Sequence, residues 1–275
     1  MRQTTGSMIC PECGKLIGVG EEKCPFCGAW RPGLYGWTPV VQRLFGQRLD
    51  LIAIIVMGCV GLFIASLVLQ PEAILQMNGL FSILSPGQRA LYQLGMTGGV
   101  AWREGWWWTV LTAIYLHGGL LHIFFNVMWI RRMGPQVEEV YGPARAFVIF
   151  SVAGATGFVL SNVVSGSPSI GASGSIFGLL AALIVYGRKR GGSMMTMQLW
   201  QWAAVMFAMG FFMGGVNNWA HAGGFAGGWV TAQAMRFSEK RESRGVQLLA
   251  LALLALTGAG VVLSFIKVTS LLLIR

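Results

Sequence analysis

The stretch "PSIGASGSIFG", residues 168–178, lies inside a charge-free run that extends from Ala146 to Gly187. Such a run is long enough to cross a membrane, because about 20 apolar residues span the hydrocarbon core. Its centre is nevertheless crowded with proline, glycine and serine, which loosen a helix or add a hydroxyl group. We therefore expect two membrane helices with a break between them, and non-helical backbone at membrane depth just before Ser173.

The composition indicates a membrane protein. Of the 275 residues, 55% are hydrophobic and 11% are charged, and the mean hydropathy is +0.62. A soluble domain carries about 25% charged residues. The net charge of +10 does not by itself indicate nucleic-acid binding, because the basic residues form short clusters between apolar runs, as cytoplasmic loops do. We expect a lipid bilayer and no nucleic acid among the partners.

Apolar runs predict seven membrane-spanning helices. Their ranges are 51–69, 118–130 with an extension into the Trp-rich segment before it, 146–164, 173–186, 197–213, 219–235 and 246–266. Basic residues gather in alternate loops, which places the N-terminus in the cytoplasm and the C-terminus outside. The inner loops would hold Arg43, Arg48, Arg131, Arg132, Arg145, Arg188, Lys189, Arg190, Arg236, Lys240, Arg241 and Arg244. The opening of the chain is polar and does not resemble a cleavable signal peptide.

The opening segment forms a module of its own, residues 1–30. It reads "CPECGKLIGVGEEKCPFCG" and contains two Cys-x2-Cys knuckles, each aiming two thiolates at one point: Cys10, Cys13, Cys24 and Cys27. This spacing favours a structural zinc in a four-cysteine site. Iron in the same geometry and a disulfide pair are the alternatives, the latter disfavoured in a reducing cytoplasm. Residues 31–49 read as a linker, 50–236 as the membrane core, and 237–275 as a cytoplasmic loop with the seventh span.

Polar residues inside the membrane region mark a candidate site. His221 begins the sixth predicted span, Ser173 the fourth, and His122 and Asn126 lie four residues apart in the second. These three spans run in the same direction, so the four side chains lie at a similar depth near the outer surface. Polar groups at such depth are costly and are functional candidates. We interpret His117 as a structural residue that bonds the loop to the helix ends.

The absence of acidic residues from three of the predicted spans limits the possible catalytic mechanisms. None of the ten acidic residues falls in the fourth, fifth or sixth span, and no HExxH sequence occurs. This excludes a paired-aspartate protease, a metalloprotease of that type and a Ser-His-Asp triad. A serine activated by one histidine remains, with His221 as the base for Ser173. His122, Asn126 and backbone N–H groups near Gly171 could then stabilise an oxyanion.

"GASG" at residues 171–174, "HIFFN" at 122–126 and "AHAGGFAGG" at 220–228 together resemble the rhomboid intramembrane serine proteases. The resemblance covers residues 50–235 and implies an all-α, six-helix rhomboid-like core with a seventh C-terminal helix. It implies Ser173 as nucleophile, His221 as base, and His122, Asn126 and Gly171 on the oxyanion side. Phe177 falls where the family packs an aromatic beside the histidine, and Gly224 and Gly228 would let the fourth and sixth spans approach closely.

One position departs from the family pattern. Thr109 follows Trp108 where the family usually carries an arginine. The departure concerns the geometry of the first loop and not the Ser-His pair. The implied activity is a serine endopeptidase that cuts transmembrane segments of other proteins near the outer face. Substrates would arrive between the second and fifth spans or through the loop-covered top. A catalytically silent rhomboid-like protein that binds membrane clients is the alternative, and a transporter is disfavoured. The metal module could dock a cytoplasmic partner.

Overall fold

A computed structural model of the chain describes residues 3–10, 13–33, 35, 37–39, 51–75, 82–212, 214–235 and 242–273. It divides into two compact units, Met1–Leu51 and Ile52–Arg275. Much of the predicted linker and of the loop after the sixth span lies outside the described residues, as do the basic residues Arg43, Arg48, Arg236, Lys240 and Arg241. The predicted domain boundaries remain a prediction.

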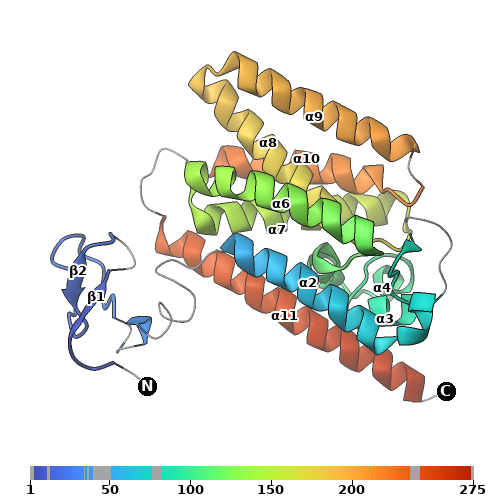
Figure 1. Ribbon diagram of the computed structural model, residues 1–275, viewed down its shortest axis with the longest axis horizontal. Coiled ribbons are helices and arrows are strands. Elements are labelled where there is room, and N and C mark those ends of the chain that lie inside the picture. The colour runs from blue at the N-terminus through green and yellow to red at the C-terminus, as the bar shows by residue number, and fades with distance from the viewer. Residues whose placement is uncertain are drawn as a thin grey trace. The chain divides into compact units, whose positions relative to one another are not determined.

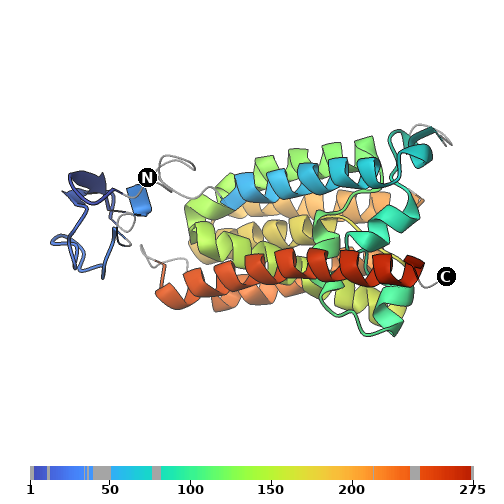
Figure 2. The ribbon, with the colours of Figure 1, turned by 90° about the horizontal axis from the view of Figure 1, so that it is seen from below.

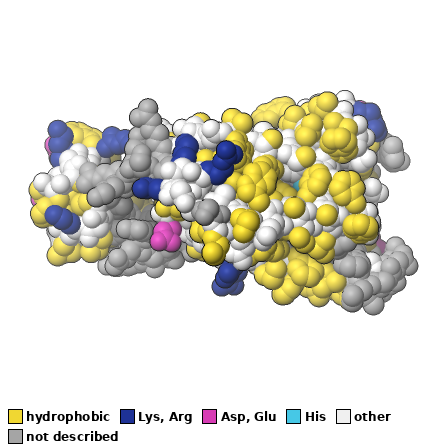
Figure 3. Space-filling model, turned by 90° about the horizontal axis from the view of Figure 1, so that it is seen from above, with side chains coloured by type: hydrophobic (Ala, Val, Ile, Leu, Met, Phe, Trp, Pro, Cys, Tyr) yellow, Lys and Arg dark blue, Asp and Glu magenta, His cyan; other side chains and the backbone are white. Residues whose placement is uncertain are grey.

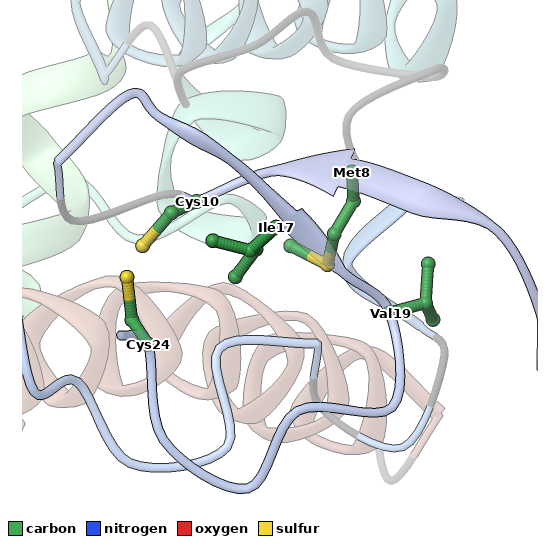
Figure 4. Close-up of a cluster of buried hydrophobic side chains, with 5 residues drawn as sticks. All are labelled: Met8, Cys10, Ile17, Val19 and Cys24. Atoms are coloured by element: carbon green, nitrogen blue, oxygen red, sulfur yellow. The ribbon is translucent and has the colours of Figure 1, made fainter. Parts of the chain in front are cut away.

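The small unit is a two-stranded hairpin with a minimal core. Strands β1 (Ser7–Ile9) and β2 (Leu16–Gly18) pair antiparallel, with Met8 opposite Ile17. Five buried side chains from the strands and the residues around them form a cluster, shown in Figure 4: Met8, Cys10, Ile17, Val19 and Cys24. So few apolar side chains supply little hydrophobic stabilisation, which is typical of small folds that depend on a metal.

The large unit is built from helices (Figure 1). Its long helices are α2 (Leu51–Leu69), α6 (Leu120–Tyr141), α7 (Pro143–Val164), α8 (Ser173–Arg190), α9 (Ser193–Phe212), α10 (Asn218–Ala234) and α11 (Arg244–Leu273). The short elements η2 (Pro71–Leu75), α3 (Gln88–Gln93), α4 (Gly99–Arg103), α5 (Thr109–Thr112) and η4 (Ala113–Tyr115) lie between α2 and α6. Figure 2 shows the long helices running roughly along a common direction.

Helix α8 forms the centre of the large unit and packs against α7 and α10. From Gly174 to Val185 its residues are buried. Glycines make this packing possible: a Cβ on Gly178 would lie 3.2 Å from the Gly224 carbonyl oxygen, and one on Gly174 would lie 3.0 Å from the Ala220 carbonyl oxygen. Without side chains at these positions the two helix backbones come into direct contact. The predicted close approach of the fourth and sixth spans is thus confirmed.

Three helices, α2, α7 and α11, are long and apolar enough to cross a membrane, among the residues described. A fourth span results if Thr109–Tyr115 and α6 are counted together. Helix α10 has 17 residues, and α8 ends in Arg188, Lys189 and Arg190. Because α8 is enclosed by other helices, it needs few lipid-facing apolar side chains. The count of seven spans therefore stays a prediction.

The predicted backward extension of the second span is a separate, bent segment and not a straight continuation of α6. The segment Thr109–Tyr115 meets α6 at an angle of 95°, so the two do not form one straight helix. Gly118 and Gly119 separate them, and the backbone at Gly119 is extended. Helix α6 instead continues forward past Ile130, through Arg131 and Arg132, to Tyr141. The Trp-rich segment belongs to the loop between α2 and α6.

Apolar side chains cover much of the helical surface (Figure 3). On α9 the exposed large hydrophobic side chains include Met194, Met197, Val205, Phe211 and Phe212, and α2 and α11 expose further ones. A soluble protein rarely exposes contiguous apolar patches of this extent, because water penalises them. In a bilayer the same surface is matched to the lipid tails.

Helix α11 holds the loop between α2 and α6 in place. Trp108 donates a hydrogen bond from Nε1 to Ser264 Oγ at 2.9 Å, and Gln93 donates from Nε2 to Thr269 Oγ1 at 3.2 Å. The ammonium group of Lys267 lies 5.9 Å from the ring centroid of Trp108. The loop thus contacts the last helix through polar as well as apolar groups.

Candidate active site and metal centre

Ser173 and His221 face each other across the contact between α8 and α10. The distance from His221 Nε2 to Ser173 Oγ is 2.9 Å, which is a hydrogen bond. Ser173 is half-buried, whereas His221 is only 6% exposed. The structure therefore brings together the two side chains that the sequence analysis singled out, 48 residues apart in the chain.

The turn before Ser173 is held by the backbone. The N–H group of Gly171 donates to the Ala113 carbonyl at 2.9 Å, and Ser169 exchanges both backbone hydrogen bonds with Thr97. Gly171 has φ +121°, a conformation that residues with a Cβ rarely adopt. The N-cap of α8, Ala172, offers no side-chain hydrogen bond, so the first N–H groups of α8 are left to other acceptors.

His221 is oriented from two directions. Its imidazole stacks on the ring of Phe177, with centroids 4.5 Å apart and an interplanar angle of 22°. Its helix, α10, is capped by Asn217, whose side-chain oxygen accepts a hydrogen bond from the Ala220 N–H group at 3.0 Å. His221 Nδ1 is buried and has no hydrogen-bond partner in the described part of the chain. The arrangement is a pair of residues, as expected from spans without acidic side chains.

His122 lies against the turn that precedes Ser173. Its Nδ1 accepts a hydrogen bond from the Gly118 N–H group at 3.2 Å, so in the neutral ring the proton is on Nε2. A Cβ on Gly171 would lie 2.7 Å from His122 Nε2, which places this N–H group directly beside the turn. The ring of His117 contacts that of His122 with centroids 5.1 Å apart.

Asn126 lies one helical turn after His122. Its Nδ2 donates to the His122 carbonyl at 2.7 Å, which uses one of the two amide hydrogens. The side chain is buried, and Oδ1 lacks a partner among the described residues. Thus an amide group with unused hydrogen-bonding capacity lies next to His122, on the same helix.

His117 and Thr109 are buried and contact groups of the loop before α6. His117 is fully buried, and its Nδ1 lies 3.3 Å from the Tyr115 carbonyl oxygen. Thr109 is also fully buried, and its hydroxyl group contacts Thr97 Oγ1 at 3.0 Å and the Trp106 carbonyl oxygen at 2.7 Å. The threonine therefore contributes a compact hydrogen bond to the loop in the place where an arginine was expected from the family pattern.

The four N-terminal cysteines are close enough to hold a metal ion. Their sulfur atoms all lie within 4.8 Å of one another, and none forms a disulfide bond. Cys10 and Cys27 are separated by 3.8 Å, and Cys13 and Cys24 by 3.7 Å, between sulfurs. Four sulfurs around a tetrahedral ion at about 2.3 Å would be separated by about 3.8 Å. The spacing therefore fits a tetrahedral metal.

Backbone hydrogen bonds shape both cysteine knuckles. Gly14 N–H donates to the Cys10 carbonyl and Gly28 N–H to the Cys24 carbonyl, each at 2.8 Å. Burial by itself raises the pKa of the Cys24 thiol, but hydrogen bonds from the backbone of Phe26 and Cys27 lower it to about 7. Burial and the neighbouring Cys24 and Cys13 sulfurs instead raise the pKa of Cys27. A lowered pKa favours the thiolate, which is the form that binds metals.

The sequence analysis missed several residues that surround the pair. Asn217 was not singled out, although an Asn directly before the first residue of a helix is typical of an N-cap. Its Nδ2 donates to Ser161 Oγ at 2.5 Å and to Ser169 Oγ at 2.6 Å. Asn162 donates to Thr97 Oγ1 at 2.9 Å. No signal in the sequence pairs these residues, because they come from separate elements.

Fold and site together describe a multi-pass membrane protein with a serine and a histidine in hydrogen-bond contact. A family model described as a Rhomboid domain matches residues 104–237. Rhomboid protease GluP of Bacillus subtilis (strain 168) is 35% identical over 162 residues, covering 54% of this chain and 31% of that protein. Putative rhomboid protease YdcA of the same organism is 29% identical over 144 residues, covering 50% and 69%.

A plant relative carries a different name. Inactive RHOMBOID-like protein 8 of Arabidopsis thaliana is 28% identical over 156 residues, covering 52% of this chain and 42% of that protein. The chain thus spans only about a third to a half of the length of GluP and of this plant relative. Residues 104–237 are thus similar to the Rhomboid domain, and the relatives reported include one named inactive as well as two named proteases.

Proposed function

We propose that the protein is an intramembrane serine endopeptidase that cuts the transmembrane segments of other membrane proteins. The observation that carries the proposal is the 2.9 Å contact between His221 Nε2 and Ser173 Oγ. Homology alone does not support protease activity, because one of the relatives is named inactive. A protein that only binds membrane clients has no need for a base within hydrogen-bond distance of a serine.

The proposed mechanism begins with proton transfer. Ser173 Oγ attacks the substrate carbonyl carbon while its proton moves to His221 Nε2. The imidazolium then gives that proton to the leaving amine, and a water molecule repeats the sequence on the acyl-enzyme. Stacking on Phe177 keeps the imidazole plane in one orientation through both transfers. No acidic residue takes part, since none lies in α8, α9 or α10.

The oxyanion is proposed to be stabilised by His122, Asn126 and backbone N–H groups. His122 Nε2 carries the proton because Nδ1 accepts from Gly118, so it donates without being charged. The second amide hydrogen of Asn126 and the N–H groups at the start of α8 add donors. Gly171 allows this approach because it has no side chain. One such donor is commonly worth about 10²–10³ in rate.

The site is proposed to lie near the outer membrane face, with the N-terminus in the cytoplasm. Ser173 and His221 sit at the beginnings of α8 and α10, whereas the basic residues Arg188, Lys189 and Arg190 end α8. Basic residues favour the cytoplasmic side. A regular helix hides its carbonyl groups, so substrates need helix-weakening residues near the cut.

Substrates are proposed to arrive between α6 and α9. Helix α9 packs mainly against α8 and exposes much of its surface. Its contact with α6 includes Trp129 and Trp202, whose rings meet edge to face at 5.6 Å. The four-cysteine site is proposed to hold a structural zinc, since the four thiolates leave no position open for a substrate.

Labelling with a serine-directed fluorophosphonate tests the proposal. The purified full chain in liposomes should be labelled at Ser173, and it should cleave a tagged single-span test protein. Ser173→Ala should lose both properties, and His221→Ala should reduce both by at least about a thousandfold, because the serine loses its base. Folded wild-type protein that neither labels nor cleaves would favour the client-binding alternative.

A further inference from the structure

We propose that Asn217 is a positioning residue that sets the distance between the nucleophile and the base. The inference rests on the proposed function and adds a residue to it. Asn217 contacts neither reacting atom; it acts through the elements that carry Ser173 and His221. Its side chain joins the beginning of α10 to the segment before α8 and to the end of α7.

On the base side, Asn217 defines where α10 begins. Its side-chain oxygen accepts from the Ala220 N–H group at 3.0 Å, and its carbonyl oxygen accepts from the His221 N–H group at 3.2 Å. These two bonds form the first turn of α10. Because His221 lies in that turn, a shift of Asn217 moves the imidazole with it.

On the nucleophile side, Asn217 holds Ser169, which lies four residues before Ser173. The Nδ2 group donates to Ser169 Oγ at 2.6 Å and to Ser161 Oγ at 2.5 Å. Both serines are buried, at 8% and 0% exposed. Ser169 is in turn paired through its backbone with Thr97. One side chain therefore ties the base helix to the turn that presents the nucleophile.

The amide group of asparagine suits this role. It has one oxygen for the helix cap and two N–H hydrogens for the two serine hydroxyl groups. Serine also caps helices well, but its hydroxyl group is too short to reach beyond the cap. Capping and bridging can therefore be separated by substitution. Since a misplacement of about 1 Å can cost about 10²-fold in rate, losing the bridge alone should slow the reaction.

The test compares Asn217→Ser, which keeps the cap, with the double variant Ser161→Ala/Ser169→Ala, which keeps Asn217 but removes its two acceptors. Fluorophosphonate labelling yields the fraction of molecules that react and the rate constant of those that do. We expect each variant to label as many molecules as wild type with a rate constant lower by about tenfold or more, and peptide cleavage to lose kcat with KM unchanged.

A triple variant and a matched control test whether the three side chains act through one bridge. Adding Asn217→Ser to the double variant should slow labelling no further, because both remove the same bridge. Ser165→Ala should label at the wild-type rate, since Ser165 Oγ donates to the Ser161 carbonyl and accepts from the Ser167 N–H group, and neither bond involves Asn217. Wild-type rates in Asn217→Ser, a smaller labelled fraction with an unchanged rate, or additive effects would each overturn the proposal.

A spectroscopic measurement keeps the inference separate from the activity. The chain has three histidines, so the imidazole nitrogens of 15N-histidine-labelled protein can be assigned by substitution. We expect the His221 Nε2 resonance in Asn217→Ser to move toward its position in Ser173→Ala, where the hydrogen bond is absent. An unmoved resonance would overturn the positioning role even if the wild type proved inactive. Absence of labelling in wild type would instead contradict the proposed function.

Discussion

Gly171 is the residue on which the geometry around Ser173 depends most directly. Its φ of +121° turns the chain into α8, and its missing side chain leaves room for the His122 imidazole. Its N–H group also bonds to the Ala113 carbonyl, which links the turn to the loop before α6. Gly171 thus fixes the backbone conformation of the turn, leaves space for the His122 imidazole and links the turn to the loop before α6.

Gly171→Ala should lower the rate of fluorophosphonate labelling by about a hundredfold, because the added Cβ would lie 2.7 Å from His122 Nε2 and displace the turn. The matched control is Gly105→Ala, which also has a positive φ, +72°, but nothing within 4 Å of the added Cβ. It should lose about 1 kcal/mol of stability and keep the wild-type labelling rate. Equal labelling rates in the two variants would contradict the assigned contact.

Thr109 illustrates how a departure from a family pattern is resolved. Its hydroxyl group satisfies its own hydrogen bonds with Thr97 and Trp106, so the loop needs no guanidinium at this position. Both of these hydrogen-bond partners are uncharged groups. The loop is therefore stabilised by neutral hydrogen bonds.

At the scale of the helices, the packing of α8 against α10 brings Ser173 and His221 together. Both helices present glycines at the contact, which lets the backbones meet without intervening side chains. Since Ser173 and His221 both lie in the first turn of their helices, their separation is sensitive to this packing. The contact is stabilised by close packing, as is usual for membrane helices.

Gly228→Ala should destabilise the protein by about 1–3 kcal/mol, because the new Cβ would lie 2.6 Å from the Gly178 carbonyl oxygen and overpack the contact. The measurement is unfolding of the detergent-solubilised protein. Gly258→Ala in α11 is the control, since nothing lies within 4 Å of its Cβ, and it should be neutral or slightly stabilising. A Gly228→Ala variant as stable as Gly258→Ala would show that the helices can separate without cost.

Helix α11 and the loop before α6 form a second contact that supports the site. Trp108 bonds to Ser264 on α11, and Ala113, five residues later, accepts the Gly171 hydrogen bond. Helix α11 is thereby connected to the turn before Ser173 through two hydrogen bonds and the short segment from Trp108 to Ala113. Helix α11 therefore also supports the turn that precedes Ser173.

At the scale of the whole molecule, the chain divides into a cysteine module and a helical part. Each has its own buried cluster, so each can be disturbed separately. The sulfur spacing in the module fits a tetrahedral ion, while the candidate site in the helical part is proposed to consist of a serine, histidines, an asparagine and backbone groups. Loss of the metal should therefore affect the module first.

Chelation of purified protein, or Cys24→Ser, should remove about one equivalent of metal and expose residues 1–30 to proteolysis, because little core remains without the ion. Metal content is measured by mass spectrometry, which also distinguishes zinc from iron. Labelling of Ser173 should persist. Cys59→Ala is the control and should keep its metal, since Cys59 lies in α2 outside the four-cysteine group. Metal-free wild type with a protease-resistant module would contradict a structural ion.

Local patterns in the sequence were enough to predict the helices and the candidate residues. Runs of apolar residues located the long helices to within a few residues at most ends, since burial in lipid requires such runs. Cysteine spacing located the candidate metal ligands, because a knuckle is a local turn. The 95° bend between Thr109–Tyr115 and α6 was not predicted, since hydropathy reports how apolar a segment is and not the direction in which it runs.

What the sequence by itself determined is the membrane location of the helices, the four-cysteine cluster and the choice of Ser173 and His221, since each rests on short-range pattern or on the scarcity of ionisable residues at membrane depth. Only the tertiary structure decided the 2.9 Å contact, the bend before α6, the tautomer of His122 and the bridge through Asn217. These depend on atoms from elements far apart in the chain, and their distances are determined by how the helices pack.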